Sequence, residues 1–195
     1  MHDPTIDHLC IVKRILRYLK GSIGRGLLLK NNGSTNIEGY VDADWAGNML
    51  DRKSTTGYCT LVGGNMVTWK SKKQTVVARS SAEAEYRAMA AASCELIWLK
   101  GLLTDLGFQP NTPIVLHCDN QAAMHIASNP VFHERTKHIE VDCHYVRNQV
   151  QSKVIETVYT RSQDQLADIF TKPLPTVPFL LILSKLGSIN PLDPA

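Results

Sequence analysis

Hydrophobic residues recur along this chain with two different periods, and each period predicts a different kind of element. In residues 8–20 the apolar positions lie three or four apart, which predicts an amphipathic helix with a basic opposite side. A short apolar strand over 27–29 and a polar linker over 31–36 follow, and we place a domain boundary in that linker. The apolar stripe of the helix consists of Leu9, Val12, Leu16 and Leu19.

The middle of the chain alternates between apolar and polar residues, which is the period of a strand. Residues 37–44, 57–62 and 66–70 each predict one. The last two are joined by Gly63-Gly64-Asn65, which is typical of a hairpin turn. Three consecutive strands are therefore expected to form an antiparallel meander.

Helical and strand patterns alternate in the second half of the chain. A long helix is expected from Ser80 or Ser81 to about Leu106, and Gly107 ends it. After Pro173 the chain is rich in proline, and we expect a tail with one short helical turn. This order of elements predicts an α/β fold in which helices pack against a mixed sheet. The remaining predicted elements are strands over 114–118 and 154–160 and helices over 120–127, 136–149 and 163–171.

Composition narrows the class of protein. A length of 195 residues suffices for one domain with flanking segments, and a hydrophobic fraction of 44% allows a sizeable core. The longest apolar run, 179–183, is too short to span a membrane, and the first residues lack a signal-peptide pattern. Five scattered cysteines without a C-x-x-C pair argue against a disulfide framework and a zinc finger. We expect a cytoplasmic or nuclear protein that is not secreted and has no membrane partner.

Basic residues are concentrated in one segment. The formal net charge is only +3, but residues 52–82 contain six basic residues and no acid. Such a segment suits a polyanion, and it fits equally well a strand edge that is protected by lysines. The six residues are Arg52, Lys53, Lys70, Lys72, Lys73 and Arg79.

Acidic residues inside predicted elements are candidates for catalysis. Asp42 lies within a predicted strand, where aspartate is disfavoured, and Asp44 would share its face. In the long helix, the segment Ser80-Ser81-Ala82-Glu83 matches a capping box, which gives Glu83 a structural role. Glu85 instead begins the apolar stripe that faces the sheet, where burial without a partner would be costly.

Two further carboxylates come from the second half of the chain. Asp119 ends a buried strand, which is a common place for a site in an α/β fold, although a helix N-cap is the simpler local explanation. Asp168 lies in the last predicted helix and, taken alone, indicates an exposed helix acid. As an ordered set from separate elements, these acids suit two hard cations about 3.5–4 Å apart, which activate water and stabilise a leaving oxygen.

Six motifs follow one another in order between about residues 37 and 175, at 40–47, 52–58, 80–86, 118–123, 135–139 and 167–172. They resemble the ribonuclease H domain in the Pol polyprotein of copia-type retrotransposons, and residues 8–20 resemble the end of the upstream reverse transcriptase segment. The resemblance implies a ribonuclease H-like fold, with three antiparallel strands first in a five-stranded mixed sheet flanked by helices. It divides the chain into a reverse transcriptase tail (1–33), a ribonuclease H domain (34–175) and a C-terminal tail (176–195).

The same resemblance implies an activity. Two Mg²⁺ ions, for which Mn²⁺ can substitute, would be held by four carboxylates, and the RNA strand of an RNA–DNA hybrid would be hydrolysed to 5′-phosphate and 3′-hydroxyl ends. The implied partners are the hybrid and the reverse transcriptase segment of the parent polyprotein, in a cytoplasmic virus-like particle or the nucleus. The implied catalytic and metal-binding residues are Asp42, Glu85, Asp119 and Asp168. Candidates for contacts to phosphates and to the minor groove, where 2′-hydroxyls are displayed, are Lys70, Lys72, Lys73, Arg79, Asn120 and Gln121.

Some features depart from that pattern. The segment 161–165 lacks the histidine that many cellular relatives carry there, and no polymerase motif occurs upstream, so polymerase activity is not expected. We expect a structural role for His138, Asp142 and His144.

Two other functions fit part of the sequence: a catalytically silent remnant that only binds nucleic acid, and a DNA-cutting integrase of the same superfamily. The integrase is disfavoured because the long capped helix supplies its acid near its start and no zinc-binding module precedes the domain.

Overall fold

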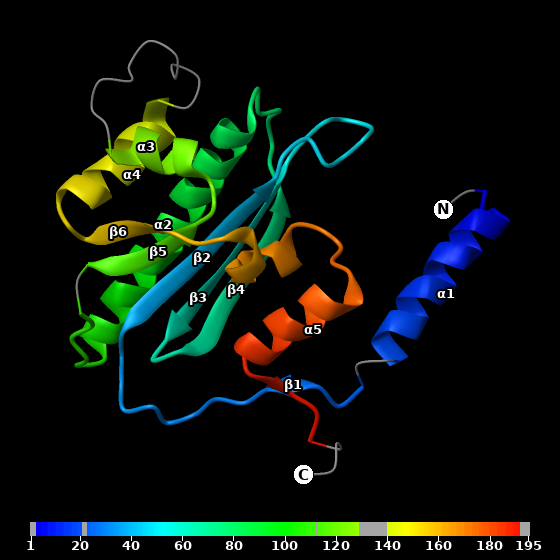
Figure 1. The fold of residues 1–195 in the computed structure, drawn as a ribbon, viewed down its shortest axis with the longest axis horizontal. Helices are drawn as coiled ribbons and strands as arrows, with labels where there is room; N and C mark the ends of the chain where they lie inside the picture. Colours follow the sequence, from blue (N-terminus) through cyan, green and yellow to red (C-terminus); the bar gives the residue numbers. More distant parts are fainter. Residues whose placement is uncertain (1–2, 21–22, 112, 129–139, 192–195) are drawn as a thin grey trace.

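A five-stranded mixed sheet forms the centre of the computed structural model, which describes residues 3–20, 23–111, 113–128 and 140–191 (Figure 1). Its strand order is β4-β3-β2-β5-β6; the first three strands pair antiparallel, β5 pairs parallel with β2, and β6 pairs parallel with β5. The predicted α/β class and the antiparallel meander are confirmed. The strands are β2 (Ile37–Asp44), β3 (Thr55–Val62), β4 (Asn65–Lys73), β5 (Ile114–Cys118) and β6 (Ile155–Tyr159).

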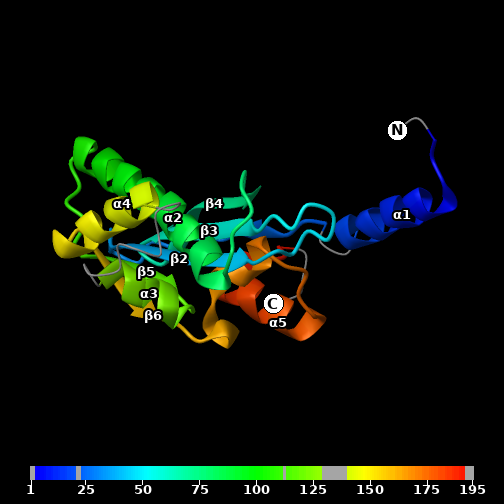
Figure 2. The same ribbon diagram turned by 90° about the horizontal axis from the view of Figure 1, so that it is seen from above.

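Helices cover both faces of this sheet. On one face, Met89 and Leu96 of the long helix α2 (Ser81–Asp105) lie in a buried cluster with Val41 of β2. On the other face, Leu166 and Ile182 pack against β3 and β4. Figure 2 shows α2 and α4 above the sheet and α5 below it. The remaining helices of the domain are α3 (Gln121–Ser128), α4 (Glu140–Gln151), the 3-10 turns η2 (Ser162–Asp164) and η3 (Leu166–Phe170), and α5 (Thr176–Lys185).

The structure corrects the prediction of one helix over 163–171. The segment forms the two separate 3-10 turns η2 and η3, because Gln165 between them is extended, with φ −75° and ψ 104°. The predicted helix over 136–149 is seen as α4 from residue 140, and its first residues lie outside the described part of the chain.

The expected tail with one helical turn is also wrong. Residues 176–185 form the ten-residue helix α5, and Ile182 and Leu186 are buried against the sheet. Pro178 falls in the first turn of α5, where its missing N–H leaves no helical bond unmade, so the proline content does not prevent a helix. Beyond it, β7 (Ser188–Ile189) pairs antiparallel with β1 (Gly26–Leu27), so residues from both flanking segments share a small sheet.

The amphipathic helix predicted near the start is present as α1 (Ile6–Lys20), and it lies apart from the central sheet (Figure 1). All four residues of its predicted apolar stripe are exposed. The ring of Tyr18 meets that of Phe179 on α5 edge to face, with 5.9 Å between ring centroids. The helix therefore forms as its period predicts, while its apolar side is left uncovered by the described residues of this chain. No helix among those residues is long and apolar enough to cross a membrane.

Two glycine positions shape the sheet. Gly63 and Gly64 connect β3 to β4 with φ of 56° and 77°, the pair of positive values that a type I′ hairpin turn requires. Gly57 of β3 pairs with Asp42 of β2, and a Cβ at this position would lie 2.5 Å from the Thr171 Cγ2 atom. Only glycine lets the chain after η3 lie this close to the sheet, beside Asp42.

We predict that Gly57→Ala destabilises the protein by about 1–3 kcal/mol, because the added methyl forces the segment around Thr171 away from β3. Urea unfolding measures the change in the free energy of unfolding. Gly101→Ala is the matched control, because Gly101 lies in α2 with open space around its Cβ position and alanine favours helix. Equal stability of Gly57→Ala and the unmodified protein would contradict the packing account.

Candidate active site

Asp42 lies on the sheet face that carries η3. Its neighbours Val41 and Ala43 point into the core beneath α2, so strand alternation directs Asp42 to the opposite face. Only 3% of Asp42 is exposed, and its Oδ2 atom accepts a hydrogen bond from the Thr171 hydroxyl. The strand thus buries a carboxylate that contacts the Thr171 hydroxyl and the Lys172 ammonium, the latter 3.6 Å away.

Asp119 is placed beside Asp42 by the register of β2 and β5. Tyr40 pairs with His117 at the end of this parallel ladder, and Asp42 and Asp119 each follow two residues later. Ligand atoms of the two carboxylates lie within 4.8 Å of one another. The rings of Tyr40 and His117 stack at 4.2 Å between centroids, which shows that these two side chains share one face of the sheet. The Asp119 Oδ2 atom accepts a hydrogen bond of 2.9 Å from the Ser162 hydroxyl.

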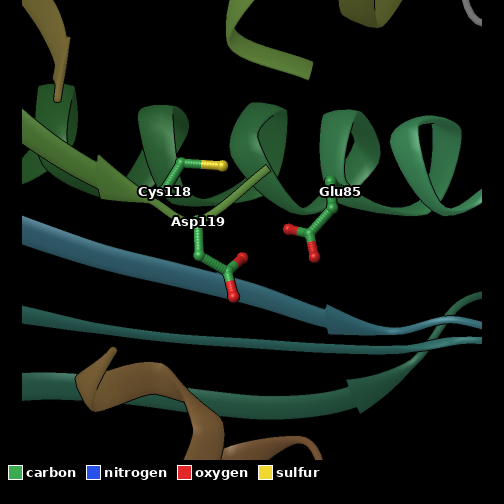
Figure 3. Close-up of side chains that lie close together, drawn as sticks. All are labelled: Glu85, Cys118 and Asp119. Carbon is green, nitrogen blue, oxygen red and sulfur yellow. The ribbon is translucent and has the colours of Figure 1, made fainter. Parts of the chain in front are cut away.

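The N-cap explanation offered for Asp119 applies instead to its neighbour. Asn120 Oδ1 accepts from the backbone N–H of Ala123 at 3.0 Å, which caps α3. Asp119 is half-buried, and its carboxylate lies beside that of Glu85, with ligand atoms of the two within 4.8 Å of one another (Figure 3). Its side chain therefore contributes to the site and not to the helix end.

Glu85 is buried at the start of α2, as the helical stripe predicts. It is 4% exposed, and its Oε1 atom accepts from the backbone N–H of Ala43 at 3.2 Å. Its Oε2 atom is buried without a hydrogen-bond partner among the described residues. Glu83 has the expected capping role: the Ser80 hydroxyl accepts from its N–H at 3.2 Å, and its carboxylate accepts from the N–H of Arg79 at 2.8 Å.

Asp168 completes the group from the opposite side. It lies in η3, is 6% exposed, and its Oδ1 atom is 2.9 Å from the Lys172 ammonium. Ligand atoms of Asp42, Asp119 and Asp168 lie within 4.8 Å of one another, and so do those of Glu85, Cys118 and Asp119. Because Asp119 belongs to both groups, the four carboxylates form one acid cluster, consisting of Asp42, Glu85, Asp119 and Asp168.

The acid cluster is electrostatically strained. Burial raises the pKa of Glu85 to about 9, and the charges of Asp42 and Asp119 add to the rise. Burial also raises the pKa of Asp168 to about 6, against the opposing effect of its contact with Lys172. Without a cation, Glu85 therefore keeps its proton at neutral pH.

These residues fit a divalent metal. Carboxylate oxygens are the ligands that Mg²⁺ and Mn²⁺ prefer, and the unpartnered Oε2 atom of Glu85 supplies a buried oxygen that a cation would satisfy. A positive ion would also relieve the repulsion that raises the pKa of Glu85. The thiol of Cys118 lies beside the cluster, and burial raises its pKa to about 12, so it stays protonated and is a poor ligand for these hard ions.

Three residues that hold the cluster were missed by sequence reasoning. Gln165 is fully buried; its Nε2 atom donates to the Val41 carbonyl at 3.0 Å and its Oε1 atom accepts from the N–H of Ala167 at 3.2 Å. Thr171 and Lys172 contact Asp42 and Asp168 directly. The spacing of four residues between Asp168 and Lys172 could have predicted their ion pair. Nothing in the sequence around Gln165 indicates its buried contacts.

The residues proposed to contact nucleic acid lie near the cluster. Asp42 pairs with Gly57, and Gly57 pairs with Ser71, so the backbone of Lys70 and Lys72 lies two strands from Asp42, at about 10 Å. Strand alternation turns the side chains of these two lysines toward the face that carries α2. The three lysines of β4 are exposed on an edge strand. Lys73 pairs with Asp51 at 3.1 Å, and the Lys70 ammonium lies 5.8 Å from the ring centre of Tyr58.

The other candidates lie around the same end of the sheet. Arg79 and Gln121 are exposed, and Asn120 is half-buried as the cap of α3. Of the residues expected to be structural, Asp142 pairs with Arg87 at 3.6 Å and His144 contacts Asn148 at 2.9 Å. His138 lies outside the described residues.

Comparison with solved structures defines the class of fold. A ribonuclease H1 isolated from compost aligns with 70% of this chain and 93% of its own length, at a TM-score of 0.52 and 15% identity. A structure of the same enzyme in complex with an RNA/DNA hybrid gives a TM-score of 0.51 over 70% of this chain and 94% of that one, at 14% identity. The chain therefore has the ribonuclease H fold.

Sequence comparison identifies the relatives. Over 97% of its length the chain is 49% identical to the retrovirus-related Pol polyprotein from transposon RE2 of Arabidopsis thaliana, and over 96% it is 48% identical to that from transposon RE1. Identity to the corresponding polyprotein from transposon TNT 1-94 of Nicotiana tabacum is 39% over 96% of the chain. The chain is a homologue of the Pol polyproteins of copia-type retrotransposons. It spans 13–14% of the length of these relatives, and no protein-family model matches it.

We predict that the stability of the metal-free protein falls as pH rises from 6.5 to about 8.5. The folded state keeps the Glu85 proton up to about pH 9, whereas the unfolded state loses it near pH 4.5, so rising pH favours unfolding by up to about 1.4 kcal/mol per pH unit. Urea unfolding in EDTA measures the slope. Glu85→Gln removes this titration and should flatten the slope.

Glu156→Gln, which changes an exposed glutamate of β6, is the control and should leave the slope as it is. If Glu85→Gln kept the slope of the unmodified protein, the buried Glu85 carboxyl would be disproved as the source of the pH dependence of stability.

Proposed function

We propose that this chain is the ribonuclease H segment of a copia-type Pol polyprotein and hydrolyses the RNA strand of RNA–DNA hybrids with two divalent metal ions. The observation that supports this most directly is the acid cluster: four carboxylates from β2, α2, the end of β5 and η3 converge, and Asp119 is common to both of its groups. Homology to Pol polyproteins and the ribonuclease H fold support the class of enzyme.

The acid cluster would hold the metal ions. Asp42, Asp119 and Asp168 would form one set of ligands, and Glu85 with Asp119 would form the other. When bound, Mg²⁺ would supply an activated water and neutralise charge on the leaving oxygen. Within the protein, Gln165 and Thr171 fix the position of η3 against β2, and the Ser162 hydroxyl orients Asp119.

The hybrid is expected to lie across the cluster and the exposed lysines of β4. These lysines lie on an edge strand two strands from Asp42, and their positive charge would suit the phosphates of a bound duplex. Asn120 and Gln121, which follow Asp119 directly, would contact the minor groove with its 2′-hydroxyls. A solved ribonuclease H1 of the same fold is in complex with an RNA/DNA hybrid, and this supports the choice of substrate.

Replacing Asp42 or Asp119 by Asn should lower Mg²⁺-dependent hybrid cleavage by more than about 100-fold, because even residues that merely support metal ligands cost 10–100-fold when changed. A labelled hybrid, incubated with and without Mg²⁺, measures the rate. Asp105→Asn is the control, because Asp105 is exposed and lies about 30 Å along α2 from Glu85, and it should retain full activity.

Circular dichroism checks that each variant is folded. Cleavage at the original rate by Asp42→Asn or Asp119→Asn would contradict the assignment. If the unmodified protein binds the hybrid tightly but never cuts it with Mg²⁺ or Mn²⁺ present, a silent, nucleic-acid-binding remnant would replace the nuclease as the function.

Replacing Lys72 and Lys73 together by Gln should weaken hybrid binding and reduce its dependence on salt. Each phosphate contact contributes about 0.9 to the slope of log K against log salt concentration, so losing two lowers the slope by up to about 1.8. Fluorescence anisotropy of the non-cleaving Asp119→Asn protein at several salt concentrations measures it. Lys153→Gln, at the opposite end of the sheet before β6, should not change the slope. An unchanged slope in the double variant would remove these lysines from the interface.

A further inference from the structure

Lys172 brings a positive charge into the acid cluster itself. Its ammonium is 2.9 Å from Asp168 Oδ1 and 3.6 Å from Asp42 Oδ2. Both carboxylates are buried, whereas 38% of the Lys172 side chain is exposed. The ammonium therefore reaches from the solvent side into the gap between two carboxylates that are also candidate metal ligands.

The contacts of Lys172 offset the negative charge that the fold buries at Asp42 and Asp168. Two buried carboxylates close together repel one another and lose their hydration. An ammonium offers three donors and one positive charge, which suits two acceptors at once. The backbone N–H of Lys172 also donates to the Asp168 carbonyl at 3.2 Å, which fixes the start of the side chain next to its partner.

A divalent ion held by the same carboxylates would compete with this ammonium. Such an ion lies about 2.0–2.1 Å from its oxygen ligands and carries two charges, so it repels a neighbouring ammonium and uses the same lone pairs. The long stem of lysine is flexible and this one is partly exposed, so the head group can move into solvent without disturbing the core.

We propose that Lys172 is the internal counter-ion of the acid cluster: its ammonium holds Asp42 and Asp168 together in the metal-free protein and is displaced when a divalent ion binds them. This inference rests on the proposed metal site. Lys172 acts in it as a positioning residue, which keeps the ligands gathered between binding events and sets how tightly metal is held. The site is thereby tuned for reversible metal binding.

The test measures Mn²⁺ binding to the full chain without nucleic acid, by isothermal titration calorimetry. Lys172→Met, which keeps the stem and removes the charge, should bind Mn²⁺ about tenfold more tightly, because one nearby charge typically shifts such equilibria by a factor of ten or more. The melting temperature of the metal-free variant should fall, and Mn²⁺ should restore it. Lys172→Arg, which keeps the charge, should bind Mn²⁺ as weakly as the unmodified protein.

Lys185→Met is the matched control. Lys185 pairs with Asp164 at 2.7 Å outside the acid cluster, so its loss should leave the affinity for Mn²⁺ unchanged. Affinity for Mn²⁺ in Lys172→Met that is equal to or weaker than that of the unmodified protein would overturn the counter-ion role alone. If the unmodified protein binds no Mn²⁺, or Asp119→Asn binds it equally well, the metal site fails and the inference fails with it.

A second measurement does not depend on any neutral variant being folded. In ¹⁵N-labelled unmodified protein, the side-chain ammonium signal of Lys172, assigned from its loss in Lys172→Arg, should shift when diamagnetic Mg²⁺ saturates the site. The signal of Lys185 should stay in place. A Lys172 signal that does not move at saturating Mg²⁺ would show that the ammonium is not displaced, and would overturn the proposal.

Discussion

The mutual repulsion of four carboxylates at the ends of β2 and β5 is the constraint that governs this structure. Burial and the neighbouring charges of Asp42 and Asp119 raise the pKa of Glu85 to about 9, so a proton on Glu85 and the Lys172 ammonium offset part of the cluster's charge in the metal-free protein. The fold must therefore hold these side chains in place against a force that separates them. Electrostatic preorganisation of this kind would suit the proposed metal-dependent nuclease, because the ligands would be gathered before the ions arrive.

Close packing of η3 on the sheet supplies the opposing force. Gly57 leaves room for the chain around Thr171, and buried Gln165 bonds to the carbonyl of Val41, next to Asp42. Helix α5 covers the same face and buries Ile182 and Leu186 there. Residues outside the acid cluster thus determine where Asp168 lies, which explains how a segment of irregular 3-10 turns can hold a buried carboxylate in place.

The parts of the fold and site with a regular period could be predicted from sequence. The burial of Glu85 was predicted because α2 repeats its buried positions, and β2, β3 and β4 were predicted from their alternating pattern. Asp168 depended on family resemblance, because 3-10 turns leave no period to detect. Gln165 and Thr171 could not be found, since their partners on β2 lie 124 and 129 residues away in the chain. The proline content around α5 concealed a helix whose apolar residues face the core.

Locating bound ions tests the central claim most directly. Crystals of the chain soaked with Mn²⁺, with diffraction recorded near the manganese absorption edge, would show the ions by their anomalous scattering. The account predicts manganese among the oxygens of the acid cluster, with ligands from Asp42, Glu85, Asp119 and Asp168. Manganese bound elsewhere, with these four carboxylates making no contact to it, would contradict the account.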